Sequence, residues 1–221
     1  MSLRFPQIFP MKKTHIAEFF ARLAAIEPKP ETELTYTSRF TLLVAVVLSA
    51  QATDKSVNKA TPALFKKAGT PAKMAALGAK GIEKYIRTIG LYRNKAKHVA
   101  ALSQRLLDDH KGRVPKDLDA LTALPGVGRK TANVVLNVGF GIPTFAVDTH
   151  VFRLANRTGL AAGKTARAVE DALDACVPDP YRVHAHHWLI LHGRYICTAR
   201  APRCADCVVR DLCGWPEKTA G

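Results

Sequence analysis

The stretch Leu-Pro-Gly-Val-Gly-Arg-Lys-Thr-Ala at residues 124–132 predicts a tight turn that opens into a helix. Pro125 fixes one backbone φ angle, while Gly126 and Gly128 permit conformations that a side chain would forbid. The turn delivers backbone N–H groups to the start of a helix near Arg129, and helix starts bind anions readily. The stretch therefore fits a phosphate-binding hairpin or an ordinary turn between two helices.

Lys130 is an unusual residue for the first turn of that helix. A cation there opposes the helix dipole, so local stability would not select it, and local rules tend to be broken at functional sites. The dipole and neighbouring Arg129 would favour the neutral amine, a nucleophile able to form a Schiff base with a sugar carbon. The alternative is a lysine that contacts phosphates only.

The cysteines gather at the end of the sequence. Six, two and five residues separate Cys197, Cys204, Cys207 and Cys213, and Cys176 is left over as an expected core thiol. An odd number clustered in this way is not typical of a secreted disulfide framework, so we expect a reducing, intracellular compartment. Four thiolates suit a closed metal site, but both zinc and a [4Fe–4S] cluster use this ligand set. The spacing alone leaves the metal open.

Composition describes a globular chain with a preference for polyanions. The 221 residues are 48% hydrophobic and carry a net charge of +15. Each Lys or Arg that neutralises a phosphate also releases condensed counterions, so nucleic acid is the favoured partner. The longest apolar run, residues 42–48, is far shorter than the roughly 20 residues that span a bilayer. We therefore expect no membrane partner.

Helical periodicity dominates the chain, and strand-turn-strand signals are missing. Residues 40–50 are ambiguous, because β-branched residues suit a strand whereas the Leu and Ala content suits a buried helix. Asp148 follows an apolar segment and precedes a helix, which fits an N-cap or a functional carboxylate. The histidines at 184–192 are expected to be packed or surface residues rather than a second metal site. The sequence predicts an almost all-helical protein.

Several blocks occur together in an order that resembles the bacterial endonuclease III family of helix-hairpin-helix DNA glycosylases. They are residues 48–54, 88–92, 124–137, 147–150 and 186–195, followed by the four-cysteine ending. The resemblance runs from about Met11 to Cys213 and so covers nearly the whole chain.

The resemblance implies an all-α, two-lobed helix-hairpin-helix DNA glycosylase fold with a C-terminal four-cysteine iron–sulfur cluster loop. One lobe would be a six-helix bundle at 32–142 that contains the helix-hairpin-helix at about 118–140. The other would join 1–31 to 143–221 and hold a [4Fe–4S] cluster on the loop 197–213. It also favours a helix at 40–50, which the residues alone left open.

The resemblance also implies roles for single residues. Lys130 would be the nucleophile and Asp148 the essential carboxylate. Gln51 would fill the gap left by a flipped base, with Ile89 and Leu91 wedged into the base stack. The other expected DNA contacts are Gly126, Val127, Gly128, Arg129, His150, Arg194, Arg200 and Arg203.

The implied activity is bifunctional. The enzyme would flip an oxidised pyrimidine such as thymine glycol out of double-stranded DNA and excise it through a lysine Schiff base. It would then cleave the strand 3′ to the abasic site, and abasic DNA would serve the lyase step alone. The resemblance further implies a monomer in the bacterial cytoplasm, near the nucleoid.

Two alternatives remain at this point. A related adenine-mismatch glycosylase is monofunctional, lacks the lysine equivalent to Lys130 and carries a long C-terminal recognition domain. A catalytically silent module would bind DNA through the hairpin alone and would have no need for both Lys130 and Asp148.

Overall fold

The computed structural model describes residues 10–219, and these residues contain helices and no β-strand. The elements are α1 (Lys13–Ile26), α2 (Arg39–Ser49), α3 (Asp54–Ala68), α4 (Pro71–Ile86), α5 (Tyr92–His110), α6 (Leu118–Thr122), α7 (Arg129–Phe140), α8 (Thr149–Thr158), α9 (Ala166–Cys176), the 3₁₀ helix η1 (Asp179–Tyr181) and α10 (Arg182–Tyr195). The prediction of an all-α chain is confirmed. None of the described helices is long and apolar enough to cross a bilayer.

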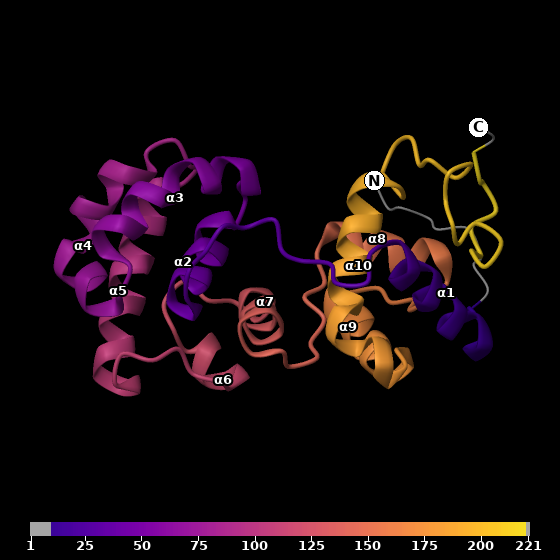
Figure 1. The fold of residues 1–221 in the computed structure, drawn as a ribbon, viewed down its shortest axis with the longest axis horizontal. Helices are drawn as coiled ribbons and strands as arrows, with labels where there is room; N and C mark the ends of the chain where they lie inside the picture. Colours follow the sequence, from indigo (N-terminus) through magenta and orange to yellow (C-terminus); the bar gives the residue numbers. More distant parts are fainter. Residues whose placement is uncertain (1–9, 220–221) are drawn as a thin grey trace. The chain divides into compact units, whose positions relative to one another are not determined.

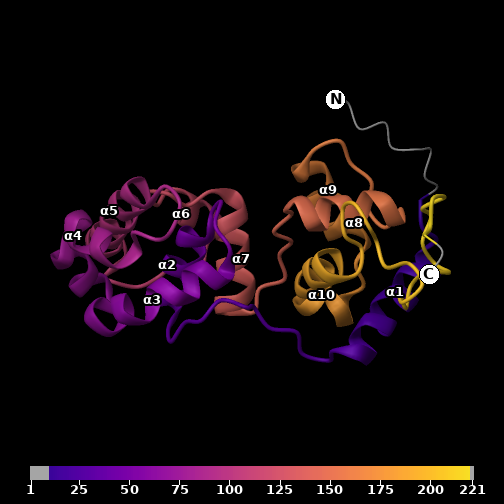
Figure 2. The ribbon, with the colours of Figure 1, turned by 90° about the horizontal axis from the view of Figure 1, so that it is seen from above.

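The chain divides into two compact units, each of which is continuous in space (Figures 1 and 2). The hairpin unit, Thr32–Ile142, contains α2 to α7. The cysteine unit joins the chain up to Glu31 to the chain from Pro143 onward, so it contains α1 and α8 to α10. Helix α1, indigo in Figure 1, therefore lies with the orange and yellow C-terminal elements.

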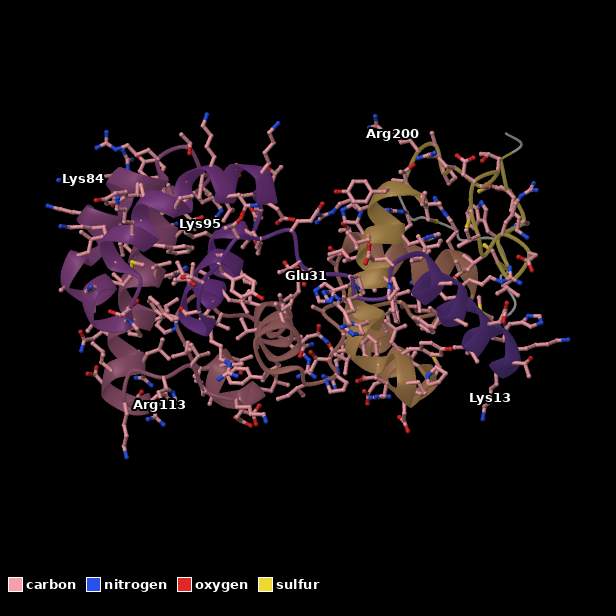
Figure 3. All side chains as sticks on the ribbon, viewed as in Figure 1. Lys13, Glu31, Lys84, Lys95, Arg113 and Arg200 are labelled. Carbon is pink, nitrogen blue, oxygen red and sulfur yellow. The ribbon has the colours of Figure 1, made fainter. Side chains whose placement is uncertain are left out.

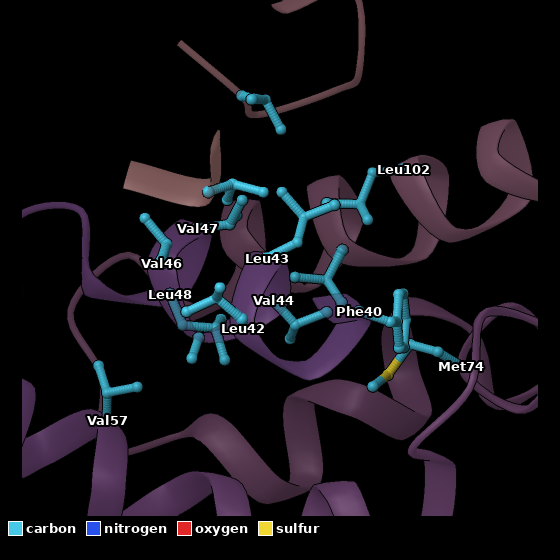
Figure 4. Packing of buried hydrophobic residues seen from close by; sticks show 14 of the residues in the cluster. Phe40, Leu42, Leu43, Val44, Val46, Val47, Leu48, Val57, Met74 and Leu102 are labelled. Atoms are coloured by element: carbon cyan, nitrogen blue, oxygen red, sulfur yellow. The ribbon is translucent and has the colours of Figure 1, made fainter. Parts of the chain in front are cut away.

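Helix α2 is the central helix of the hairpin unit. Every residue from Phe40 to Leu48 is buried, so the helix is surrounded by protein on all sides, as expected of a core helix. Ser38 begins it with a capping box, in which Ser38 Oγ accepts from the Thr41 N–H and Thr41 Oγ1 accepts from the Ser38 N–H. Figure 4 shows α2 side chains packed near Met74 and Leu102. The ambiguous stretch is thus a helix.

Helix α7 is fixed against α2 by contacts near its C-terminus. The Arg39 Nε donates a hydrogen bond of 2.7 Å to the Gly139 carbonyl, and its guanidinium lies 4.5 Å from the Phe140 ring centre. A Cβ on Gly139 would lie only 3.2 Å from Leu42 Cδ2, so the two helices approach closely. The short helix α6 precedes α7, and Asp117 caps it through the Ala120 N–H. The helices on both sides of the turn between α6 and α7 are therefore held in place, α6 by its cap and α7 by its contacts with α2.

The cysteine unit is held together by contacts between α1 and the C-terminal half of the chain. The Trp188 indole N–H donates a 2.7 Å hydrogen bond to the Glu27 carbonyl. Phe20 on α1 lies 6.3 Å from the Trp188 ring. Arg22 forms a 2.6 Å ion pair with Asp211, which lies in the loop that carries the cysteines. Helix α1 thus braces both α10 and the cysteine loop.

The histidines of α10 occupy packing positions. His186, His187 and His192 are buried, and the ring of His184 lies 5.7 Å from that of Trp188. Burial, with a smaller contribution from His184, lowers the pKa of His187 to about 4. A neutral histidine at physiological pH suits an apolar interior.

Candidate DNA-binding hairpin and cysteine cavity

The turn at 123–128 presents an uncapped helix start. Gly126 has φ +78°, and a Cβ there would lie 2.7 Å from His98 Cβ, so glycine is required for both reasons. The Val127 N–H closes the turn by donating to the Leu124 carbonyl at 3.1 Å. Gly128 is the extended N-cap of α7 and supplies no side-chain cap. The first N–H groups of α7 therefore lack a side-chain cap, as an anion site requires.

Lys130 stands in the first turn of α7 with its side chain exposed. That turn contains no acidic residue. Among the described residues, no ion pair or side-chain hydrogen bond involves Lys130. The amine is thus accessible and uncompensated beside a helix start that suits a phosphate.

Asp148 is the N-cap of α8 in the cysteine unit. One carboxylate oxygen, Oδ1, accepts hydrogen bonds of 2.9 Å from the N–H groups of both His150 and Val151. Within the described part of the chain, no hydrogen bond is formed by Oδ2. The cap therefore fixes the carboxylate while leaving one oxygen available for other chemistry.

Arg153 ties the start of α8 to its surroundings. Its Nε donates to the Cys197 carbonyl at 3.0 Å, and Nη2 donates to the Gly193 carbonyl at 2.6 Å. The same Nη2 lies 3.4 Å from His150 Nδ1. A single half-buried guanidinium therefore connects α8, the end of α10 and the first cysteine of the loop.

The two loops expected to enter the base stack lie side by side in the hairpin unit. A Cβ on Gly90 would lie 3.8 Å from the Gln51 carbonyl oxygen. Gln51 is exposed, and Leu91 is 59% exposed. Ile89 differs from these two residues, because its side chain is 2% exposed and belongs to the core of the unit. A wedge role for Ile89 stays a prediction, and it would need this side chain to become exposed when DNA binds.

The four C-terminal cysteines line one cavity in the cysteine unit, with about 360 Å³ of empty space including its open part. No described His, Cys, Asp or Glu side chains gather closely enough to hold a single metal ion. Burial raises the pKa of the Cys207 thiol to about 11, with like charges from the other three cysteines as smaller causes. Holding four thiolates here requires a positively charged group, and an iron–sulfur cluster satisfies that requirement.

Hydrogen-bonding groups reach three of the four sulfur atoms, and two of these groups are donors. Arg157 Nη1 donates to Cys197 Sγ at 3.5 Å, and the Trp215 N–H donates to Cys213 Sγ at 3.4 Å. His192 Nε2 lies 3.4 Å from Cys207 Sγ. Donors to the sulfur atoms are the outer contacts that orient and tune thiolate-bound clusters.

The cations expected to meet phosphates are placed differently from one another. Arg200 is exposed and points outward from the cysteine loop (Figure 3). Arg203 is exposed but forms a 2.8 Å ion pair with Asp206. Arg194 is half-buried in the last turn of α10. Of the three, Arg200 has the most accessible charge in this structure.

Sequence reasoning missed the two arginines that serve the cysteine loop. Arg153 and Arg157 lie four residues apart on α8, among residues that are mostly buried. Two arginines on one side of a largely buried helix are a signal for a buried anionic or carbonyl-rich partner. Their partners are distant in the sequence, so the signal could not identify them.

Comparison with known proteins identifies the architecture. Residues 44–179 match the model of the HhH-GPD superfamily base excision DNA repair protein. Residues 197–213 match the iron-sulfur binding domain of endonuclease III, so the cofactor of the four cysteines is a [4Fe–4S] cluster.

Relatives match along almost the full length of the chain. Endonuclease III of Escherichia coli strain K12 is 56% identical over 208 residues, which cover 94% of this chain and 99% of that protein. Endonuclease III of Treponema pallidum is 60% identical over 194 residues, covering 88% and 92% of the two chains.

A solved structure gives the same result. It is a trapped endonuclease III–DNA covalent intermediate, which superposes with a TM-score of 0.85 at 44% identity over 92% of this chain and 96% of that one. The hairpin, the cysteine cavity and these matches agree. The chain therefore belongs to the endonuclease III family of HhH-GPD base excision DNA repair proteins.

Proposed function

We propose that this bifunctional DNA glycosylase and AP lyase excises oxidised pyrimidines with Lys130 as its nucleophile and Asp148 as its essential carboxylate. The observation that carries the assignment is the exposed, uncompensated Lys130 beside an uncapped helix start. The solved relative that was trapped as a covalent intermediate with DNA supports a nucleophilic route.

The hairpin would hold the DNA backbone. The uncapped N–H groups at the start of α7, together with Arg129, suit one phosphate. Gln51 and Leu91 are exposed in adjacent loops, where they could enter the stack once a base is flipped. Flipping brings the glycosidic bond within reach of an enzyme side chain. Positions 126–129 would thus fix the register, and the two loops would stabilise the flipped state.

The proposed chemistry proceeds through an imine. The Lys130 amine attacks C1′ of the deoxyribose, the glycosidic bond breaks, and the base leaves with the bonding electrons and takes up a proton. Opening of the sugar gives a Schiff base between Lys130 and C1′. Loss of a proton from C2′ then expels the 3′ phosphate by β-elimination, and water releases the lysine. Asp148 would stabilise positive charge developing at the sugar or assist proton transfer.

The [4Fe–4S] cluster supplies a covalent staple for the cysteine loop rather than a reacting group. Cys197, Cys204, Cys207 and Cys213 would hold it. The loop between the first two cysteines carries Arg200 and Arg203, so holding the loop fixes cations that could meet phosphates. His150 and Arg194 would contribute further contacts from α8 and α10.

We further propose that the protein acts as a monomer in the bacterial cytoplasm, close to the nucleoid. Its relatives are bacterial repair enzymes, which supports this location.

Borohydride trapping on duplex DNA with one thymine glycol tests the assignment. Wild-type protein should form a covalent adduct, Lys130→Gln should form none, and Lys84→Gln should behave like wild type because Lys84 is an exposed lysine on α4. An adduct with Lys130→Gln would mean that another amine is the nucleophile. Base release without any adduct, on thymine glycol or abasic DNA, would favour a monofunctional glycosylase, and neither product would favour a silent binding module.

A further inference from the structure

The cysteine cavity is surrounded by positive charge. Its described lining includes Arg157, Arg203, Arg210 and Lys218 and contains no Asp or Glu. Arg203 is bonded to Asp206, and Arg210 is exposed. Arg157 differs from both, because it is half-buried and reaches a cysteine sulfur directly.

Arg157 is held by one face of the cysteine loop. Nη1 donates to the Thr198 carbonyl at 2.7 Å, Nη2 donates to the Ala199 carbonyl at 3.2 Å, and the guanidinium lies 4.9 Å from the Trp215 ring. Nη1 also donates to Cys197 Sγ at 3.5 Å. Both ends of the loop are thus in contact with one guanidinium.

The charge of Arg157 has no carboxylate partner among the described residues. Its Nε is buried and forms no hydrogen bond within them. A partly buried guanidinium is costly unless a negative charge compensates it. The negative group in direct contact is the sulfur of Cys197, which is a thiolate when the cluster is bound.

We propose that Arg157 is the counter-ion of the cluster ligand Cys197 and that it sets the reduction potential of the cluster. This inference rests on the iron–sulfur assignment of the same cavity. A positive charge and a hydrogen bond at a ligand sulfur stabilise the more negative, reduced state, and both raise the potential. Arg157 therefore protects the cluster from oxidation, in addition to clamping the loop.

Redox titration of the purified holoproteins, followed by electron paramagnetic resonance and visible absorption, tests the proposal. In Arg157→Gln, the ratio of reduced to oxidised cluster at a fixed potential should fall about tenfold, which is a negative shift of about 59 mV for one electron. Ferricyanide should also bleach this variant faster than the wild type. Arg157→Lys keeps the charge and should retain most of the wild-type potential.

Arg203→Gln is the matched control, because Arg203 lines the same cavity but is paired with Asp206. Its potential should stay at the wild-type value. A fully loaded Arg157→Gln protein with an unchanged potential would reduce Arg157 to a mechanical clamp and overturn the proposal. If Arg157→Gln loses its cluster, Arg157→Lys decides between the outcomes. A loaded Arg157→Lys protein with the wild-type reduction potential supports the proposal. A loaded Arg157→Lys protein whose potential is lower by about 59 mV overturns it. Borohydride trapping of the wild type separates failure of this inference from failure of the proposed function.

Discussion

Leu91 has a backbone conformation that most side chains avoid. Its φ angle is +59°, in the left-handed region, which costs residues other than Gly, Asn and Asp about 1–2 kcal/mol. Leu91→Asn should therefore raise the free energy of unfolding by about 1 kcal/mol, because Leu91 is 59% exposed and loses little packing. A short polar side chain wedges poorly, so excision should fall about tenfold, equivalent to about 1.36 kcal/mol of transition-state stabilisation.

Lys111 offers a matched control for this experiment. It is also left-handed, with φ +54°, and it is the exposed C-cap of α5. Lys111→Asn should raise the free energy of unfolding, measured by urea denaturation, by a similar amount and leave excision of thymine glycol unchanged. If Leu91→Asn excises as fast as the wild type, Leu91 has no part in the base stack.

Asp148 combines a structural role and a proposed chemical one, and two substitutions separate them. Asn is as good an N-cap as Asp, whereas Ala loses the cap at a cost of about 1 kcal/mol. Asp148→Asn should thus unfold at nearly the wild-type urea concentration, and Asp148→Ala at a lower one. Excision should collapse in both. Normal excision by Asp148→Asn would leave the carboxylate with the role of a cap only.

At single residues, what the sequence can predict depends on whether the signal is local. Lys130 and the four cysteines are marked by neighbours within a few positions, so their patterns could be recognised. Ile89 also lies in a recognisable block, but whether its side chain faces outward depends on helices that pack from elsewhere in the chain. The partners of Arg157 are about 40 residues away, and no local pattern could reveal them.

Among the helices, α8 and α10 show how close packing supports a functional residue. A Cβ on Gly193 would lie 2.9 Å from the backbone oxygen of His150, two residues after Asp148. Backbone cannot yield as a flexible side chain can, so Gly193→Ala should push the start of α8 aside. Overpacking of this kind costs about 1–3 kcal/mol. Excision should fall by about ten- to a hundredfold, because a misplacement of about 1 Å can cost that much.

Gly139→Ala is the comparison for Gly193→Ala, and calorimetry with single-turnover excision would measure both variants. At Gly139 the added Cβ would meet the end of the Leu42 side chain at 3.2 Å, which can shift. Gly139→Ala should therefore lower activity far less. Equal losses of excision would show that stability alone, and not the position of Asp148, controls the rate.

Helix α2 marks the limit of periodicity as a guide to elements. Because all positions from Phe40 to Leu48 are buried, no alternation remains to distinguish a helix from a strand. The capping box of Ser38 and Thr41 is a helix signal in the same stretch, and it is local. The capping box could have identified this stretch as a helix from the sequence. The central place of α2 in the core, however, depends on packing with the other helices of the unit.

Stability of the entire chain toward acid should depend on His187. Its pKa in the folded state is about 4, below the value of about 6.5 expected when unfolded, so the unfolded chain binds the proton more tightly. The contribution of neutral His187 is complete above about pH 6.5 and is lost as the pH falls toward 4, with about 2 kcal/mol lost by about pH 5. Urea denaturation gives the free energy of unfolding of wild type and His187→Gln between about pH 5 and 8. This free energy should change less steeply with pH in the variant. Parallel curves would assign the acid sensitivity to other groups.

The positive charge of the chain is divided unevenly between its two units. The hairpin unit has 18 Lys and Arg against 7 Asp and Glu, and the cysteine unit has 15 against 11. Counterion release makes the affinity for duplex DNA fall as salt rises. The logarithm of the binding constant falls linearly with the logarithm of the salt concentration, with a slope of about 0.9 for each phosphate neutralised. If both units contact phosphates, Arg129→Gln and Arg200→Gln should each reduce the slope by about 0.9.

Lys164→Gln should leave the slope unchanged, because Lys164 lies in an exposed loop before α9 and outside every block assigned to DNA contact. Fluorescence anisotropy across a salt series measures all three. A slope that responds to Arg129 alone would restrict phosphate binding to the hairpin unit, and one that responds to Lys164 as well would mean that the charge acts as a diffuse field rather than through specific contacts.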